Sequence, residues 1–508
     1  MKISIALQKL MPYVYHATVG IGVVVSFLMV IVSMQNAQFS AWGCCGYVVF
    51  VLLSVMASSM FAVRYRVYRE HEVCFLMALT FCVTCLTICF LAGAGRVCAG
   101  GIDAYKAQMS LESGKLCSFH PPRYAYWYNW NVLLSGLGLV FGRNVFVGQL
   151  LNALGLSFAL IPIYKISRMI FGRGCARFAA IAFGLNPVVV LYSTVLSSEC
   201  WAATFMVWAY YLIILCFRGK VPAQRLLISG CLIFAGVALG ISEFFKPTSV
   251  MLKVAVAVAI VQDGMITRNV RRATLRLVLL VCICCISSFV AVTGHKCTLC
   301  LAAGKPELRN NTVWSGLVGE LVLGLNVKND GGYDRALAWK MHGGGPEVRI
   351  KLLKDSIVRD WREYPALMVR KFINLHGTSW SRGAALSEIR ESFRGVTEDQ
   401  RKKSAQMPLF LVELADNSLV VFRIMFFFAV AGCLFARKDD RWGAWKILPL
   451  VVVMEFMLLE QLIECHGRYK SVIYPFFFLV LPGVKGWMMP YSGIKATLIN
   501  RYNRIVRS

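Results

Sequence analysis

The sequence predicts an all-α polytopic membrane protein with about twelve transmembrane helices and two large extracytoplasmic segments. Three observations support this class: 58% of the 508 residues are hydrophobic, only 16% are charged, and the apolar residues are gathered into long runs. Because a bilayer core is roughly 30 Å thick, a helix needs about 20 apolar residues to cross it. The lipid bilayer, rather than water, is therefore the expected solvent for most of this chain.

The apolar runs predict where the spans lie. Val32-Ser33-Met34-Gln35 is a poor cleavage site, so we expect the first run to be a retained helix rather than a signal peptide. The eighth run is short and contains Lys253, which fits a tilted helix, a helix in a thinned membrane or a re-entrant segment. The predicted spans are residues 17–34, 41–63, 74–93, 144–163, 178–195, 200–217, 226–245, 250–261, 275–293, 419–436, 447–463 and 472–487.

The basic residues indicate which side of the membrane each loop faces. The formal net charge is +28, and lysines and arginines cluster without Asp or Glu at residues 165–177, 218–225 and 268–276. This is the positive-inside pattern of cytoplasmic loops, which lie beside anionic headgroups. A nucleic-acid partner is therefore not needed to explain the charge. We predict a multi-pass plasma-membrane protein with both termini in the cytoplasm.

Two longer segments fall on the extracytoplasmic side. Residues 96–143 form a loop rich in His, Pro, Tyr and Trp, and residues 296–417 are long enough for a small domain or a set of surface helices. The predicted organisation is an N-terminal transmembrane region over 1–295, this extracytoplasmic segment, and a C-terminal transmembrane region with a basic cytoplasmic tail over 418–508.

The segment 296–417 is itself predicted to contain helices. Apolar residues recur at Ile350, Leu353 and Ile357, which places them on one face of a helix. A second amphipathic stretch follows Pro365, because proline separates the two patterns.

Polar residues suited to catalysis gather at the predicted extracytoplasmic ends of the spans. An enzyme that acts on a lipid phosphate needs a carboxylate base, cations for the phosphate and an apolar groove for the lipid. Asp103, two residues before Tyr105, follows the third span and is the candidate base. Glu199 opens the sixth span and Lys246 follows the seventh. Their structural alternatives are a solvated loop acid, a charge that complements a helix dipole, and a cation that reaches the headgroups.

A further polar cluster lies between the last two spans. It is the run Glu464-Cys465-His466-Gly467-Arg468-Tyr469-Lys470, in which five hydrogen-bonding side chains within seven residues exceed what membrane anchoring needs. We therefore add Glu464, His466, Arg468 and Tyr469 to Tyr105, Glu199 and Lys246 as candidate substrate-binding residues.

Two cysteines could suggest a metal site. Cys297 and Cys300 form a CxxC pair just beyond a predicted span, with no second pair to complete four zinc ligands. A local disulfide or two unpaired thiols is the favoured interpretation, and the metal content of the protein is left unassigned.

Short motifs occur in order along most of the chain. They are His120-Pro121-Pro122-Arg123-Tyr124, Gln149 to Leu154, Ile170-Phe171-Gly172-Arg173, Leu185-Asn186-Pro187 to Ser198-Glu199, Lys246-Pro247, Gly324-Leu325-Asn326 to Asp330-Gly331-Gly332-Tyr333, and Glu464 to Tyr469 followed by Pro475. Each is weak alone. In this order, and on one side of the membrane, the set resembles the GT-C glycosyltransferases, and more narrowly their protein O-mannosyltransferase and lipid A aminoarabinose transferase branch.

The resemblance implies a GT-C-like membrane fold whose first large outer loop carries a catalytic acid. It also implies a donor in which a sugar is attached to a polyprenyl monophosphate. Asp103 matches the catalytic acid by position, but Ala104 stands where the family often has a second acid. A mechanism with paired carboxylates, or with a metal held by them, therefore does not follow. No cofactor is predicted, and a divalent metal is kept as an alternative.

The predicted function is transfer of a sugar from a polyprenyl-phosphate donor to a hydroxyl of a cell-envelope glycan, lipid or protein, at the outer face of a bacterial-type plasma membrane. Asp103 would take the acceptor proton, while Lys246 and Arg468 would stabilise the leaving phosphate. The expected partners are the lipid-linked donor, the acceptor and the bilayer, with no nucleic acid. A lipid or polysaccharide transporter and a non-catalytic scaffold of the same fold are the alternatives, and transporters place polar residues near the midplane.

Overall fold

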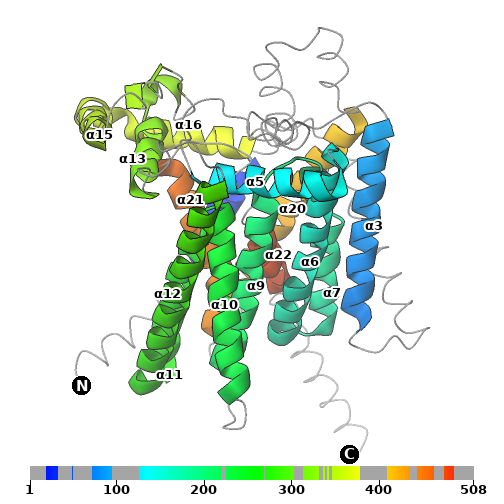
Figure 1. The fold of residues 1–508 in the computed structure, drawn as a ribbon. Helices are drawn as coiled ribbons and strands as arrows, with labels where there is room; N and C mark the ends of the chain where they lie inside the picture. The colour runs from blue at the N-terminus through cyan, green and yellow to red at the C-terminus, as the bar shows by residue number, and fades with distance from the viewer. Residues whose placement is uncertain are drawn as a thin grey trace, which may run out of the picture.

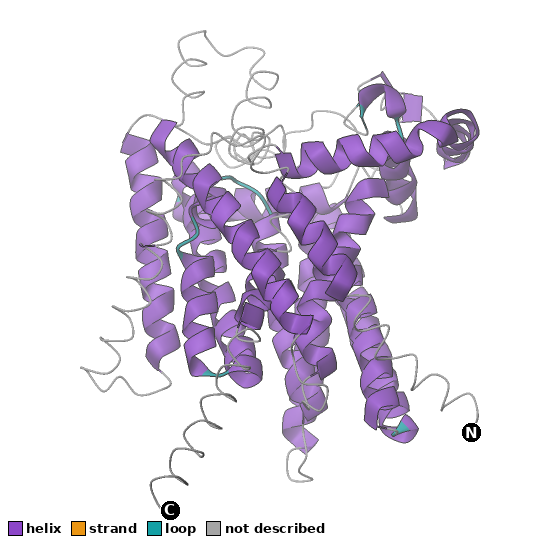
Figure 2. Cartoon of the chain, turned by 180° about the vertical axis from the view of Figure 1, so that it is seen from behind, coloured by secondary structure: helices purple, strands orange, loops and turns teal. Residues whose placement is uncertain are grey.

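In the computed structural model, every regular element among the described residues is a helix (Figures 1 and 2). This confirms the predicted all-α class for that part of the chain. The described residues are 19–31, 49, 71–93, 125–142, 144–218, 225–267, 269–301, 313–330, 334, 336–337, 340–341, 346–377, 409–434, 443–462 and 474–484.

Most of the helices stand side by side in one bundle (Figure 1). Among the described residues, four helices are long and apolar enough to cross a membrane, or five if one bent pair counts as a single span. The count of twelve spans stays a prediction, and the predicted span 41–63 lies outside the described residues apart from Val49. The bundle helices are α3 (His71–Gly93), α6 (Val145–Phe171), α7 (Arg173–Gly184), α8 (Pro187–Ser193), α9 (Glu199–Arg218), α10 (Arg225–Phe245), α11 (Ser249–Thr267), α12 (Val270–Leu301), α20 (Leu409–Leu434), α21 (Gly443–Leu462) and α22 (Tyr474–Val480), with a helix at Val19–Ile31 and a 3-10 turn η7 (Leu481–Val484).

The sequence predicted one continuous span over residues 178–195, but the structure has two helices in this region. Helices α7 and α8 meet at a bend of 52°. Leu185 is the C-cap of the first helix, and Asn186 caps the second: its side-chain oxygen accepts hydrogen bonds from the backbone N–H of Val188 (3.0 Å) and Val189 (3.4 Å). Pro187 follows at the first helical position, where its missing N–H costs nothing.

The predicted short span 250–261 is part of a longer helix. Helix α11 runs without a break over 19 residues, from Ser249 to Thr267. Its charged side chains have partners, since Lys253 pairs with Glu243 of α10 and Asp263 pairs with Arg276 of α12. These ion pairs explain how charges are accommodated along a helix of this bundle, and the continuous helix favours the tilted-helix alternative over the re-entrant one.

Helices α10 and α12 pack closely against each other. A Cβ atom added at Gly236 would lie 2.6 Å from Ile286 Cβ, and one added at Gly240 would lie 2.6 Å from Val290 Cβ. The spacing Gly236-x-x-x-Gly240 is the small-residue pattern that lets membrane helices approach closely. On the other side, α7, α20 and α22 share an aromatic core in which Phe478 lies 4.5 Å from Phe422 and 5.3 Å from Phe183, centroid to centroid.

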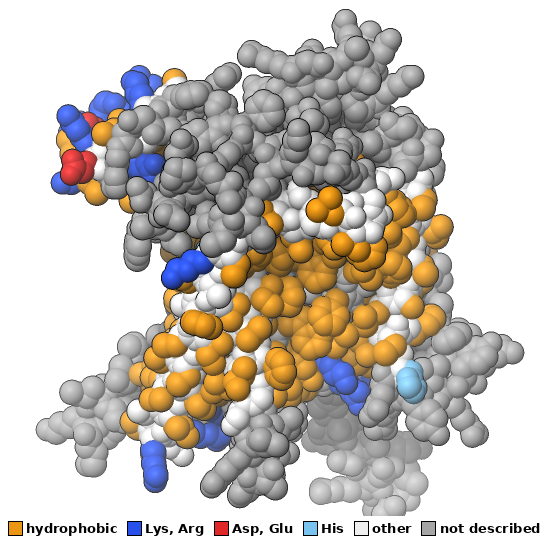
Figure 3. Space-filling view, viewed as in Figure 1, with side chains coloured by type: hydrophobic (Ala, Val, Ile, Leu, Met, Phe, Trp, Pro, Cys, Tyr) orange, Lys and Arg blue, Asp and Glu red, His pale blue; other side chains and the backbone are white. Residues whose placement is uncertain are grey.

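Side chains divide the bundle into an apolar flank and a basic end. Apolar side chains cover the flank in Figure 3, and several basic side chains lie near the end opposite α5 (Ala125–Phe141). Residues such as Val281 and Phe289 of α12 are 60% and 71% exposed, as expected of a surface that faces lipid. The basic end carries the loops predicted to be cytoplasmic. The orientation of the bundle in the cell stays a prediction, and both termini lie outside the described residues.

The end opposite the basic one carries the remaining helices. α5 and α16 (Tyr364–Gly377) lie across it, and α13 (Val313–Gly324) and α15 (Pro346–Asp360) stand near α16 (Figure 1). The prediction of a loop over residues 96–143 is wrong for residues 125–141, which form helix α5. Helix α12 extends to Leu301, past the predicted domain boundary at 295. The predicted helix around Leu353 is α15, where Leu353 packs beside Val322, Leu323 and Met341.

Candidate functional site

Helix α5 is fastened to three other elements at the end of the bundle opposite the basic one. The side-chain amide nitrogen of Asn129 donates to the carbonyl of Phe244 on α10 at 2.5 Å and lies 2.8 Å from His295 Nδ1 on α12. The indole N–H of Trp130 donates to the carbonyl of Leu196 at 3.2 Å, and its ring meets Phe245 edge-on at 5.8 Å. These contacts make α5 a cover over this end of the bundle.

The loop before α9 is held in place from α6. Gln149 Nε2 donates to the carbonyl of Thr194 at 2.9 Å, and Asn152 Nδ2 donates to the carbonyl of Val195 at 2.7 Å. Both side chains are buried, and these bonds give their amide N–H groups a partner, which lowers the cost of burying them; Asn152 Oδ1 has no hydrogen-bond partner among the described residues. The loop in turn sets the position at which α9 starts, and Glu199 lies in the first turn of α9.

Glu199 and Lys246, which the sequence nominates separately, form one ion pair. Lys246 Nζ lies 2.9 Å from Glu199 Oε1, and the two residues are 7% and 8% exposed. Ser242 Oγ donates to the carbonyl of Ala202 at 2.9 Å, which holds α9 and α10 together one turn below the pair. A buried ion pair of this kind loses much stability if a single partner is removed, because the other charge is left buried and uncompensated.

A second charged pair lies nearby and was not nominated from the sequence. Glu243 Oε1 accepts a hydrogen bond from Ser249 Oγ at 2.5 Å and also pairs with the ammonium group of Lys253. The signal that could have found it was the presence of an acid and a lysine inside two predicted spans, since ionisable groups in spans usually have a partner or a function.

The other nominated residues lie outside the described part of the chain. They are Asp103, Tyr105, Glu464, His466, Arg468 and Tyr469. Their positions and roles therefore stay predictions. Among the described residues, no group of three or more His, Cys, Asp or Glu side chains could hold a metal ion. Cys297 is a free, exposed thiol near the end of α12, and the side chain of Cys300 is not described.

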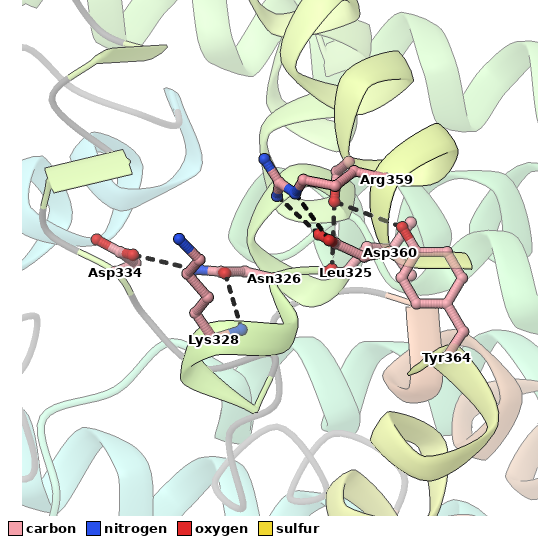
Figure 4. A network of polar contacts seen from close by, with 8 residues as sticks. Leu325, Asn326, Lys328, Asp334, Arg359, Asp360 and Tyr364 are labelled. Carbon is pink, nitrogen blue, oxygen red and sulfur yellow. Dashed lines mark hydrogen bonds and ion pairs between the residues drawn. The ribbon is translucent and has the colours of Figure 1, made fainter. Parts of the chain in front are cut away.

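The motif at Gly324 to Asp330 builds a turn rather than a charged pocket in the described structure (Figure 4). Asn326 caps the 3-10 helix η3 (Val327–Asn329): its side-chain oxygen accepts from the Lys328 N–H at 3.2 Å, and its amide donates to Asp334 Oδ2 at 3.0 Å. Lys371 of α16 is fully buried and donates to the Gly324 carbonyl at 3.0 Å. These bonds fix α13 against α16.

Figure 4 also shows an ion pair at the end of α15, beside η4 (Trp361–Glu363). Arg359 donates two hydrogen bonds of 2.7 Å to the carboxylate of Asp360. This bonding holds the pKa of Asp360 below its ordinary value and raises the pKa of Arg359. Ser356 Oγ, one turn earlier, lies 3.4 Å from both the Leu325 carbonyl and Tyr364 Oη. The network ties α15 to the turn after α13.

Residues 120–291, about one third of the chain, match a known sequence family. It is the dolichyl-phosphate-mannose-protein mannosyltransferase family. The match confirms the predicted resemblance over these residues. The matched mannosyltransferase-like region runs from just before α5 to the C-terminal half of α12, so it contains Asn129, the Glu199–Lys246 pair and the Glu243–Lys253 pair.

Solved structures resemble the chain at low identity. The archaeal oligosaccharyltransferase AglB from Archaeoglobus fulgidus, in complex with an inhibitory peptide and a dolichol-phosphate, is 12% identical with a TM-score of 0.45, over 86% of this chain and 52% of AglB. ArnT from Cupriavidus metallidurans, bound to undecaprenyl phosphate, is 15% identical with a TM-score of 0.34, over 82% of this chain and 78% of ArnT. This chain thus spans about half the length of AglB. No curated protein sequence matches it.

Proposed function

We propose that this chain is a membrane glycosyltransferase that moves a sugar from a polyprenyl-phosphate donor to an acceptor hydroxyl at the extracytoplasmic face. The observation that carries the proposal is an overlap: the mannosyltransferase-like region 120–291 contains the buried Glu199–Lys246 pair and helix α5, which lies across the same end of the bundle. The family description names a lipid phosphate that carries mannose, and we carry over the lipid-phosphate-linked sugar as the donor class.

The Glu199–Lys246 pair suits a phosphate that arrives and leaves. Lysine is a compact charge on a flexible stem, so its ammonium group can turn from a carboxylate to a phosphate oxygen without rebuilding a planar contact. Arg468, the second cation proposed for this site, then supplies the positive charge that keeps Glu199 and the phosphate compensated. Glu199 holds the ammonium in position before the donor binds. Because the pair is almost fully buried, its field acts in a medium of low dielectric, where charge on a leaving phosphate is stabilised strongly.

Asp103 completes the proposed reaction as the general base. It takes the proton of the acceptor hydroxyl as that oxygen attacks the anomeric carbon, and the bond from that carbon to the phosphate oxygen breaks. Lys246 and Arg468 stabilise the phosphate that leaves. This single displacement inverts the configuration at the anomeric carbon. Glu464, His466, Tyr105 and Tyr469 are proposed to orient the two substrates.

A reconstituted transfer assay tests the function. The purified chain is placed in vesicles with polyprenyl phosphate that carries radiolabelled mannose, together with an acceptor fraction from cell envelopes. We expect label in a new product, and loss of that product with Glu199→Gln/Lys246→Met, which removes both charges of the buried pair together, but not with Arg272→Met, which removes an exposed cation at the basic end. Donor that is moved across the vesicle but stays chemically intact would indicate a transporter. Intact, unmoved donor would indicate a scaffold, and either result overturns the proposal.

The proposed side of the reaction has its own test. Single cysteines introduced at Asp103, Trp314 and His466 in a cysteine-depleted chain should react with a membrane-impermeant reagent in intact cells. Cysteines at Arg173 and Arg272 should react only after permeabilisation. Labelling of Trp314 only after permeabilisation would place the active end in the cytoplasm and overturn the assignment of the extracytoplasmic face.

A further inference from the structure

A second polar site lies at the outer ends of α10, α11 and α12, and we call it the polar wedge. It consists of Glu243 from α10, Ser249 and Lys253 from α11, and Ser287 and His295 from α12. Glu243 Oε1 is the centre, because it receives both the Ser249 hydroxyl and the Lys253 ammonium. Helix α12 runs alongside: Glu243 interacts electrostatically with both Cys284 and His295, and Ser287 lies between these two on the helix.

The polar wedge borders the apolar flank of the bundle. Val250 and Val254, which neighbour Lys253 on α11, are 51% and 48% exposed, and Val292 on α12 is 50% exposed. The side chains of Glu243 and Lys253 are 18% and 17% exposed, about twice the values for Lys246 and Glu199. Lys253 lies four residues into α11, roughly 6 Å below its outer end. A ligand can therefore approach the wedge from the bilayer, at the depth of lipid headgroups.

Unused hydrogen-bonding capacity remains in this region. The hydroxyl oxygens of Ser287 and of Thr248, which precedes Ser249, are buried and have no hydrogen-bond partner among the described residues. Both residues are at least nine-tenths buried. A buried hydroxyl without a partner costs free energy, and a bound polar group would recover it. This observation is independent of the ion pair and also points to a ligand.

The charge balance of the wedge restricts what that ligand can be. A ligand with only a negative charge would draw Lys253 away and leave Glu243 buried at the membrane edge without a counter-charge. A ligand with only a positive charge would likewise draw Glu243 away and leave Lys253 without a counter-charge. Such an uncompensated charge is costly. A ligand with one negative and one positive group exchanges partners with the pair and leaves every charge compensated. The positive group has to donate hydrogen bonds to Glu243, which a primary ammonium does and a quaternary one does not.

We propose that the polar wedge binds the headgroup of a membrane lipid that carries both a phosphate and a primary ammonium group. The phosphate lies on Lys253 with the hydroxyl groups of Ser249 and Ser287, and the ammonium lies on Glu243. The acyl chains follow the exposed valines of α11 and α12. This site is separate from the Glu199–Lys246 pair, and its occupation does not depend on the proposed transferase activity.

Lipid retention tests the inference without any activity measurement. The full chain is reconstituted in vesicles of equal parts phosphatidylethanolamine, phosphatidylcholine and phosphatidylglycerol, extracted in mild detergent, and its retained lipids are measured by mass spectrometry. We expect phosphatidylethanolamine to be enriched about tenfold over the bulk, the ratio that about 1.4 kcal/mol of preference gives. The double variant Glu243→Gln/Lys253→Met should return the ratio to that of the bulk.

The double variant has a matched control on the same helix. Glu243→Gln/Lys253→Met removes both charges together, so neither partner is left unpaired and the chain is expected to fold. Asp263→Asn/Arg276→Met likewise removes an α11–α12 ion pair, but at the opposite end of α11, and should retain the enrichment. Equal retention of the three lipids by the unmodified chain, or enrichment that survives the first double variant, overturns the proposal. So does loss of enrichment in the control.

A second experiment, with a water-soluble compound, distinguishes binding of the lipid from binding of its free headgroup. Phosphoethanolamine has the same two charged groups but no acyl chains. We expect it to displace retained phosphatidylethanolamine only at far higher concentration than the lipid itself. Displacement at similar concentrations would show that the ligand is a water-soluble zwitterion, which overturns the assignment to a membrane lipid.

Discussion

The two ends of the bundle pair their acids with different cations. At the basic end, Glu72 of α3 is held by Arg177, by Arg173 at 2.8 Å and by the hydroxyl of Tyr164 at 2.7 Å, and Asp263 is held by Arg276. At the α5 end, Glu199 is held by Lys246 and Glu243 by Lys253. In the ion pairs described between bundle helices, the cation is thus arginine at the basic end and lysine at the α5 end. The pairs Arg359–Asp360 and Arg370–Asp330 lie outside the bundle helices.

We interpret this difference as one between contacts that stay fixed and contacts in which the cation can exchange one partner for another. A guanidinium presents several donors in a rigid plane and can hold a carboxylate and a carbonyl at once, as Arg276 does with Asp263 and with the Phe217 carbonyl at 2.9 Å. An ammonium group is a point charge that can turn to a new partner. We infer that the basic end is built for stability and the α5 end for ligands, and four predictions test the contrast.

The largest expected effect is on catalysis at the α5 end. Asp103→Asn should lower turnover about a hundredfold or more, because a general base contributes roughly that factor, while expression and folding are kept. Radiolabelled product formation from the polyprenyl-phosphate donor measures it. Asp355→Asn, which changes an exposed acid on α15, should leave turnover unchanged. Near-normal turnover in Asp103→Asn would remove that residue from the role of base.

A smaller effect is expected on donor binding. Arg468→Lys should weaken the affinity for polyprenyl phosphate about tenfold, because a planar fork that contacts two phosphate oxygens becomes a point charge. The control is Arg437→Lys, in a predicted cytoplasmic loop, which should bind donor normally; both positions lie outside the described residues. Titration of the purified proteins with the lipid measures this. Unchanged affinity in Arg468→Lys would make its cluster structural and leave Lys246 as the nominated phosphate ligand.

At the basic end, replacing an arginine by a lysine should lower the stability of the fold rather than the affinity for a ligand. Arg276→Lys keeps the charge, but a single ammonium group replaces two nitrogens that each face a different acceptor, so we expect the contact with either Asp263 or the Phe217 carbonyl to be lost. We expect the free energy of unfolding to fall by about 1 kcal/mol, as measured by denaturant titration in detergent. Lys253→Arg offers a comparison at the other end and should be nearly neutral for stability. If Arg276→Lys were the neutral one, the proposed division between fixed and exchangeable contacts would be wrong.

The smallest effect concerns the exposed ion pair on α15. Asp360 has a pKa below its unfolded value because Arg359 bonds its charged form, so the pair stabilises the fold above that unfolded value. The contribution is lost as the pH falls through the folded pKa. Because the Arg359 side chain is 62% exposed, we expect less than about 0.5 kcal/mol. The stability difference between the unmodified chain and Arg359→Gln should shrink from pH 7 to pH 3. If the stability difference did not change with pH, the effect of Arg359 would come from packing rather than from its charge.

The sequence predicted the all-helical class and several apolar spans because membrane spans follow from local hydropathy. It predicted one helix over 178–195 because hydropathy does not detect a bend, although Leu185-Asn186-Pro187 carries the cap and the proline that produce it. It assigned α5 to a loop because that helix is short and rich in Tyr, Trp and Asn. Its described polar contacts at Asn129 and Trp130 are to residues of other elements.

The sequence predicted individual residues of the candidate site but not which of them contact one another. Glu199 and Lys246 were nominated for their positions at span ends, yet their pairing joins residues 47 positions apart and no local pattern encodes it. The residues of the Glu243–Lys253 pair are only ten positions apart, and the pair was missed because the acid and the lysine inside two neighbouring predicted spans were not considered as partners. The turn at Asn326 was visible as a motif, but only the structure shows that it caps a helix and supports α16 through Lys371.

Helix α12 has 32 residues and is therefore about 48 Å long, whereas the hydrocarbon core of a bilayer is about 30 Å thick. An ordinary tilt of about 20° shortens its span by only a few ångströms. Several residues at its ends must therefore stand in the headgroup region, and His295 and Cys297 are at one of these ends. Bilayer thickness becomes a variable that acts on this protein: a thicker membrane would draw the outer turns of α12, and the polar side chains on them, toward the hydrocarbon, while a thinner one would lift them into water.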